Sequence, residues 1–170
     1  MRNETSTSSS TRPCTRSCSM MFSTTCTYAL QAMCRLAAIR SQGYASMQEI
    51  CAGTDLPDQF IAKIMRSLTK AELLTSARGR NGGFALAREP GSISLYDIVE
   101  VIDGVQQYTG CVLGLSICDD KQPCSQHEHV KPVRRQVLSY LKNTTLDAMS
   151  EALAEKQQLI RRVQKGLLDG

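Results

Sequence analysis

Residues 58–86, DQFIAKIMRSLTKAELLTSARGRNGGFAL, decide the fold class. At about 100° per residue, the apolar side chains of residues 58–70 gather on one side of a helix: Phe60, Ile61, Ile64, Met65 and Leu68. Amide and basic side chains gather on the opposite side: Gln59, Lys63, Arg66 and Lys70. Residues 73–77 and 84–87 then predict two strands that turn around Asn81-Gly82-Gly83. The stretch therefore predicts an amphipathic helix followed by a β-hairpin.

A shorter helix is expected directly before this stretch. Ser46 and Glu49 form a capping-box pair at its start, Gly53 ends it, and Pro57 suits the first position of the next helix. Two helices joined by a short turn are typical of a helix-turn-helix, and the hairpin that follows makes it a winged helix. In this fold the second helix enters the major groove of double-stranded DNA, while the hairpin lies along the phosphates or in the minor groove.

Positive charge is concentrated on these two elements. From residue 63 to residue 80, five basic side chains stand against the single acidic Glu72, which is a local charge of +4. The whole chain also carries only +4, which is too small to indicate nucleic acid by itself. The candidate DNA contacts are Gln59 and Lys63 for bases, Arg66 for phosphate, and Arg78 and Arg80 for the wing. The alternative is a solvated surface, which is what most exposed basic stripes are.

The flanking sequence predicts a mainly α-helical fold with this one small hairpin. Residues 27–40 and 94–104 have helical periodicity, and a later amphipathic helix places apolar residues at three- and four-residue steps: Val130, Val133, Val137 and Leu141. A last helix follows the break at 143–145. We expect a winged helix-turn-helix domain over 21–104, a loop over 105–129, the two later helices over 130–153, and a basic, frayed tail over 154–170.

Composition excludes several classes of protein. Residues 1–20 are rich in Ser, Thr and Arg and predict a disordered tail; the alternative is that translation starts at Met20 or Met21. No apolar run reaches the roughly eighteen residues that a membrane span needs. We find no nucleotide-binding loop, Ser/His/Asp set or paired-cysteine redox motif, so we expect no enzyme. Eight cysteines in 170 residues are too few for a disulfide scaffold, so a reducing, cytoplasmic setting is expected.

The loop sequence CVLGLSICDDKQPCSQHEH, residues 111–129, gathers three cysteines and two histidines. Its candidate ligands are Cys111, Cys118, Cys124 and His127. No pair has the two-residue Cys spacing typical of zinc ribbons, although three thiolates and one imidazole suit either tetrahedral zinc or a 2Fe–2S cluster. A disulfide is the weakest of the three possibilities, and the remaining alternative is a set of ordinary thiols in a polar loop. We expect His129 to point to solvent.

Several segments together resemble the IscR/NsrR-like family of winged-helix iron–sulfur transcriptional regulators, from about Met21 to Leu153. TYALQAMCRLA resembles the opening helix of that family, residues 58–86 its recognition helix and wing, SLYDIVEVIDG the helix before its cluster loop, and LKNTTL the break after its dimer helix. The resemblance implies a homodimer formed through the helix from Val130 to Leu141, with each subunit reading half of a palindromic operator. It also implies that Cys111, Cys118 and Cys124 bind the cluster.

The fourth ligand and the DNA target depend on finer differences within this family. His127 matches the position of a histidine ligand in the iron–sulfur-biogenesis regulators, whereas the nitric-oxide sensors use an acidic residue near the position of Thr27. This favours a 2Fe–2S cluster; a 4Fe–4S cluster, and a thiol- or zinc-based regulator without a cluster, remain alternatives. The gap between Cys111 and Cys118 is one residue longer than in the His-ligated members. Ala62 replaces a Glu that discriminates DNA sequences, so the operator is not predicted.

Overall fold

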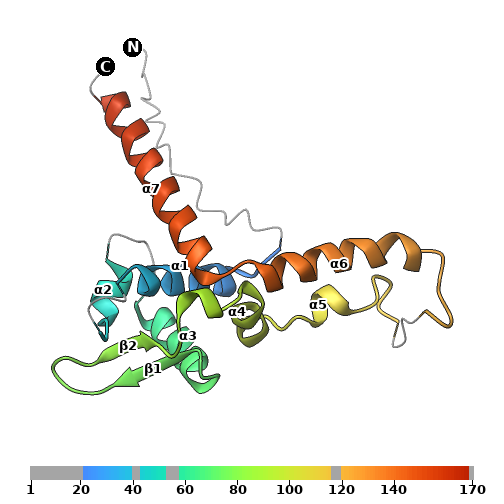
Figure 1. Cartoon of the computed structure of the whole chain (residues 1–170), viewed down its shortest axis with the longest axis horizontal. Coiled ribbons are helices and arrows are strands. Elements are labelled where there is room, and N and C mark those ends of the chain that lie inside the picture. Colours follow the sequence, from blue (N-terminus) through green and yellow to red (C-terminus); the bar gives the residue numbers. More distant parts are fainter. Residues whose placement is uncertain (1–20, 40–42, 53–57, 116–119, 169–170) are drawn as a thin grey trace, which may run out of the picture.

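The computed structural model describes residues 21–39, 43–52, 58–115 and 120–168, with backbone alone for 58 and 166–168. The elements, in chain order, are α1 (Thr24–Ile39), α2 (Met47–Cys51), α3 (Asp58–Lys70), β1 (Leu74–Ala77), β2 (Gly83–Leu86), a 3-10 turn (Pro90–Ser92), α4 (Leu95–Ile102), α5 (Gln106–Thr109), α6 (His127–Asn143) and α7 (Leu146–Leu168). As Figure 1 shows, α1 to α4 and the hairpin form one body, from which α6 and α7 extend in different directions. The predicted fold class, mainly α with a winged helix-turn-helix, is confirmed.

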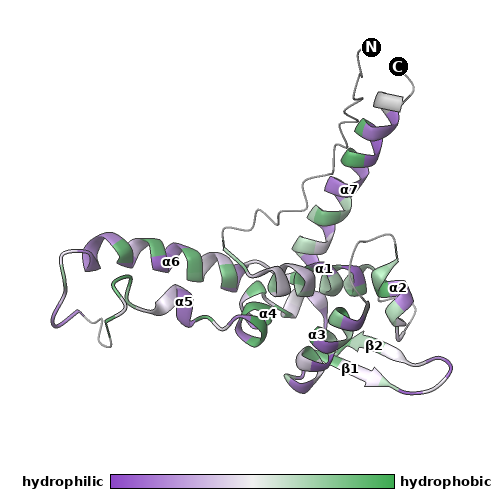
Figure 2. Ribbon diagram, turned by 180° about the vertical axis from the view of Figure 1, so that it is seen from behind, coloured by the Kyte–Doolittle hydropathy of each residue, from purple (hydrophilic) through white to green (hydrophobic). Residues whose placement is uncertain are grey.

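The core of the body forms around α1. Helix α3 buries the apolar side predicted from its sequence, with Ile61, Ile64, Met65 and Leu68 at 3% exposure or less. These side chains pack with Met33 and Leu36 of α1 and with Leu146 at the start of α7. Cys34 and Cys51 are buried in the same cluster, as small apolar side chains, in agreement with the sequence reading. Figure 2 shows α4 in hydrophobic colours and the hairpin tip in hydrophilic ones.

Local hydrogen bonds fix where α2 and α4 begin. Ser46 accepts from the Glu49 amide while the Glu49 carboxylate accepts from the Ser46 amide, and Ser94 and Asp97 form the equivalent pair at α4. Beside Ser94, the Leu95 amide donates to Thr144 O at 2.8 Å and the Leu146 amide to Ile93 O at 2.8 Å. The junction between α6 and α7 is therefore held against the start of α4.

Two boundaries in the C-terminal half differ from our expectations. The predicted frayed tail over 154–170 is wrong as far as Leu168, because α7 continues as a helix to that residue. The helix expected from Val130 begins earlier, at His127. Residues 1–20 and Cys118 lie outside the described residues. None of the described helices is long and apolar enough to span a bilayer.

Candidate DNA interface and cysteine-histidine loop

The outer side of α3 presents polar and basic side chains. Because the opposite side of the helix is buried, Gln59, Lys63 and Arg66 are exposed. Phe60, which the helical pattern placed with the core, is 38% exposed and contacts the Tyr28 ring edge-to-face, with 5.9 Å between ring centroids. The polar side of α3 is therefore available to a ligand along its N-terminal half.

The wing is joined to the helix-turn-helix by backbone hydrogen bonds. The Ala45 amide donates to Phe84 O at 2.8 Å, and the Phe84 amide donates to Ala45 O at 2.9 Å. The approach is so close that a Cβ on Gly83 would lie 2.1 Å from Ala45 O. Glycine at position 83 is therefore required for the chain before α2 to pair with β2. This pairing fixes the position of the hairpin relative to α2 and α3.

The basic side chains of the wing and of α3 remain exposed. Arg78 and Arg80 lie in the connection between β1 and β2, where the strands pair in register from Leu74 with Leu86 to Ala77 with Gly83. Among the residues that the structure describes, Lys63, Arg66, Arg78 and Arg80 have no acidic side-chain partner. Both elements lie along the lower edge of the body in Figure 1. The arrangement offers uncompensated positive charge on two rigidly connected elements, which suits a polyanion.

The apolar residues predicted on α6 face two environments. Leu141 is fully buried within its own chain, in a cluster with Leu95, Val99 and Val105. The prediction that Leu141 contacts a second subunit is therefore wrong in this structure. Val130, Val133 and Val137 instead line an open groove of about 340 Å³ between α5 and α6. Val133 is 56% exposed. The groove wall on the other side includes Tyr108, Cys111 and Val112.

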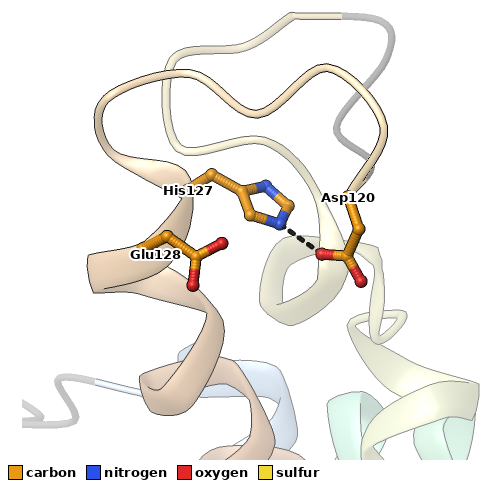
Figure 3. A group of neighbouring side chains, drawn as sticks. All are labelled: Asp120, His127 and Glu128. Carbon is orange, nitrogen blue, oxygen red and sulfur yellow. Dashed lines mark hydrogen bonds and ion pairs between the residues drawn. The ribbon is translucent and has the colours of Figure 1, made fainter.

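The cysteine-histidine loop connects α5 to α6. Cys111 and Cys124 are partly exposed and form no disulfide, whereas His127 is 6% exposed as the first residue of α6. The His127 amide donates to Cys124 O at 3.0 Å, which holds the end of the loop against the helix start. Figure 3 shows the His127 ring pointing at Asp120, with Nε2 at 2.7 Å from the carboxylate.

Asp120 was not among our predicted site residues. Lys131 donates to the Asp120 carboxylate, and this hydrogen bond, together with that from His127, lowers the pKa of Asp120. Asp120 therefore stays ionised and holds the His127 ring in one orientation. The only sequence signal is its position seven residues before a histidine in a loop rich in ligands.

The loop fits a soft metal group by its chemistry and only partly by its geometry. Among the described residues, the group whose ligand atoms all lie within 4.8 Å of one another is Asp120, His127 and Glu128, and Cys111 and Cys124 do not join it. A cluster spreads its ligands over two irons and so tolerates wider separations than a single ion. Thiolate and imidazole donors are those that iron–sulfur clusters and zinc use.

The fold and its charged surface define a winged helix-turn-helix transcriptional regulator. The chain matches the family model described as "Rrf2: Iron-dependent Transcriptional regulator" over residues 22–152. It belongs to the Rrf2 family, which agrees with the predicted resemblance and with the expectation that the chain is not an enzyme.

Relatives and solved structures similar to this chain include proteins named CymR and proteins named IscR. A putative HTH-type transcriptional regulator of Aquifex aeolicus is 34% identical over 129 residues, which cover 75% of this chain and 89% of the relative. The structure of CymR, the global cysteine regulator of B. subtilis, superposes with a TM-score of 0.64 at 26% identity, covering 79% of this chain and 98% of CymR. T. potens IscR superposes with a TM-score of 0.62 at 29% identity, covering 79% and 89%.

Proposed function

We propose that this regulator binds double-stranded DNA through α3 and the wing. The observation that carries the proposal is the pair of backbone hydrogen bonds between Ala45 and Phe84, because they hold the basic wing against the chain that leads into the helix-turn-helix. Gln59 and Lys63, near the N-terminus of α3, contact base edges in the major groove, and Arg66 contacts phosphate. Arg78 and Arg80 extend the contact along the backbone or into the minor groove.

Selection of genomic fragments by the purified protein, followed by fluorescence anisotropy, tests this proposal. We expect Lys63→Ala and Arg78→Ala each to weaken binding to the selected fragment by about tenfold, with the loss growing smaller as salt is raised. Lys156→Ala is a matched control, since it removes one exposed positive charge from α7, far from the wing. Unchanged affinity in both interface variants would refute the proposed docking surface.

The proposed regulator acts as a homodimer on a palindromic operator. Support comes from the groove lined by Val130, Val133 and Val137, since apolar side chains around an open groove favour burial by a second subunit. A dimer with two-fold symmetry presents two copies of α3 to two half-sites about one helical turn apart. Val133→Glu is expected to reduce both the dimer fraction in sedimentation equilibrium and the operator affinity. A variant that stays dimeric would refute pairing through this groove.

We propose that an iron–sulfur cluster controls the DNA affinity of this regulator in the cytoplasm. Cys111, Cys118, Cys124 and His127 hold the cluster, and it is of the 2Fe–2S type. Support comes from the place of His127, which begins α6 and is buried there. Helix α6 packs on α4, and α4 packs on α3. In this proposal, loss of the cluster shifts α6 as a whole, and α4, which packs on the C-terminal half of α6 around Val137 and Leu141, passes the shift to α3.

Regulation by thiols or zinc is the second candidate, and the likeness to CymR favours it. Anaerobic purification with a visible absorption spectrum, and with iron, sulfide and zinc analysis, separates the two. The cluster predicts a coloured protein with iron and sulfide in equal amounts, and His127→Ala is expected to alter the spectrum. A colourless protein with stoichiometric zinc would refute the cluster.

A further inference from the structure

A groove lies where α7 rises from α1. It has a volume of about 230 Å³, and side chains of both helices line it. The Ser150 hydroxyl of α7 donates a hydrogen bond to Cys34 O of α1 at 3.0 Å, which joins the two helices at the groove. In Figure 1, α7 projects upward from α1, whereas α3 and the hairpin lie below α1. The groove is therefore separate from the proposed DNA-binding surface.

One wall of the groove contains an arginine whose charge is not compensated. Arg35 of α1 is partly buried, and its Nε atom is shielded from solvent without a hydrogen-bond partner. Helix α1 contains no acidic residue, and no acidic side chain in the described part of the chain forms an ion pair with Arg35. A buried charged donor without an acceptor costs free energy, which a bound anion would recover.

The facing wall supplies a second guanidinium group. Arg161 of α7 lines the groove, and within the described ranges it also has no acidic partner. A long side chain on a helix leans toward the N-terminal end of that helix, so the guanidinium of Arg161 reaches back toward the junction with α1. The acidic residues on this part of α7, Glu151 and Glu155, are exposed and do not line the groove. The groove therefore has a positive lining.

This set of donors fits a small anion. Guanidinium groups bind carboxylate and phosphate oxygens through paired N–H donors. Three glutamine side chains add amide donors to the lining: Gln31, Gln157 and Gln158. The volume is below the roughly 300–1,000 Å³ of pockets that hold drug-sized ligands. The groove therefore suits a small molecule with carboxylate or phosphate groups.

We infer that the groove between α1 and α7 binds a small anionic metabolite between Arg35 and Arg161. The match to the family model ends at residue 152, so Arg161 belongs to the part of α7 beyond that match. Helix α1 packs against α3 in the core, so the ligand contacts the helix that supports α3. The site does not depend on the nature of the group in the cysteine-histidine loop.

Isothermal titration calorimetry of the full chain at low salt tests this inference, with succinate and inorganic phosphate as probes. We expect wild type to bind at least one probe saturably, and the preferred probe assigns the ligand as a carboxylate or a phosphate compound. Arg35→Met and Arg161→Met are each expected to weaken this binding by about tenfold, because methionine keeps an unbranched apolar side chain and removes the charge. Arg162→Met is the matched control, since Arg162 is exposed on α7 outside the groove lining, and it is expected to bind as wild type does.

The variants also separate the groove from other basic surfaces. An anion that binds to the exposed basic side chains of α3 and the wing does so equally in all of these variants, so a loss in Arg35→Met reports the groove. Circular dichroism melting curves without probe check the fold. Because Arg161 is exposed, Arg161→Met keeps the test valid whatever the stability of Arg35→Met. The absence of saturable binding of either probe, or wild-type affinity in both groove variants, would overturn the inference.

Discussion

Replacing Gly83 by alanine tests how the wing is joined to the helix-turn-helix. The added Cβ would lie 2.1 Å from Ala45 O and 2.5 Å from Ala45 C, and both are backbone atoms that move only with the chain. Relief of this overlap breaks the two hydrogen bonds between Ala45 and Phe84, at about 1 kcal/mol each. The φ of +153° at Gly83 adds about 1 kcal/mol for a residue with a side chain. The expected loss is about 3 kcal/mol in the free energy of unfolding.

Thermal unfolding followed by circular dichroism measures this loss. For a chain of this size, about 3 kcal/mol lowers Tm by roughly 6–12 °C. Gly91→Ala is the matched control, because a Cβ there meets no atom within 4 Å, and its Tm is expected to change little. If Gly83→Ala melts within 2 °C of wild type, the close approach of Ala45 and β2 is not what fixes the wing.

Three further predictions concern the core, the thiols and one ion pair. Leu141→Ala is expected to lower the free energy of unfolding by about 2–5 kcal/mol in urea titrations, because Leu141 is fully buried; a loss below 1 kcal/mol would contradict its core position. Burial, with the nearby Asp103 carboxylate as a lesser cause, raises the pKa of Cys26 to about 12, and burial raises that of Cys34 to about 11. At pH 8 both thiols are therefore almost wholly protonated, so iodoacetamide is expected to leave them unalkylated. In the metal-free protein the partly exposed Cys124 is expected to react, and mass spectrometry distinguishes the sites. Rapid modification of Cys26 in the folded chain would disprove this. Arg88→Ala removes the ion pair with Asp97 and is expected to lower the free energy of unfolding by less than about 1 kcal/mol, because both side chains are substantially exposed. A larger loss in urea titrations would mean that the pair holds the chain after β2 against α4.

The winged helix was predictable because its signals are local. The apolar sector of residues 58–70 and the capping pair of Ser46 and Glu49 depend on side chains within one or two turns of each other. The turn residues Gly82 and Gly83 also predicted the hairpin. The backbone pairing between Ala45 and Phe84 of β2 was not predicted, because the two residues are almost forty positions apart and Ala45 lies outside any strand.

The C-terminal half was harder to predict because its contacts are between distant segments. The apolar residues from Val130 to Leu141 follow one helical period, yet Leu141 is buried in its own chain and Val133 is exposed in a groove. Periodicity does not distinguish a side chain that packs within its own chain from one that contacts a partner. The basic residues after Leu153 suggested a frayed end, yet the three- and four-residue spacing continues through them. The contact between His127 and Asp120 has no sequence signal beyond the closeness of the two residues in a polar loop.

The central claim is that the group in the loop controls DNA affinity. The most direct test compares the operator affinities of the loaded and the metal-free protein, measured by anaerobic fluorescence anisotropy on one selected DNA fragment. If the group in the loop controls α3 and the wing through α6 and α4, the two affinities differ by about 5–150-fold, and the difference disappears in Cys124→Ala. Equal affinities in the loaded and metal-free forms would contradict the account.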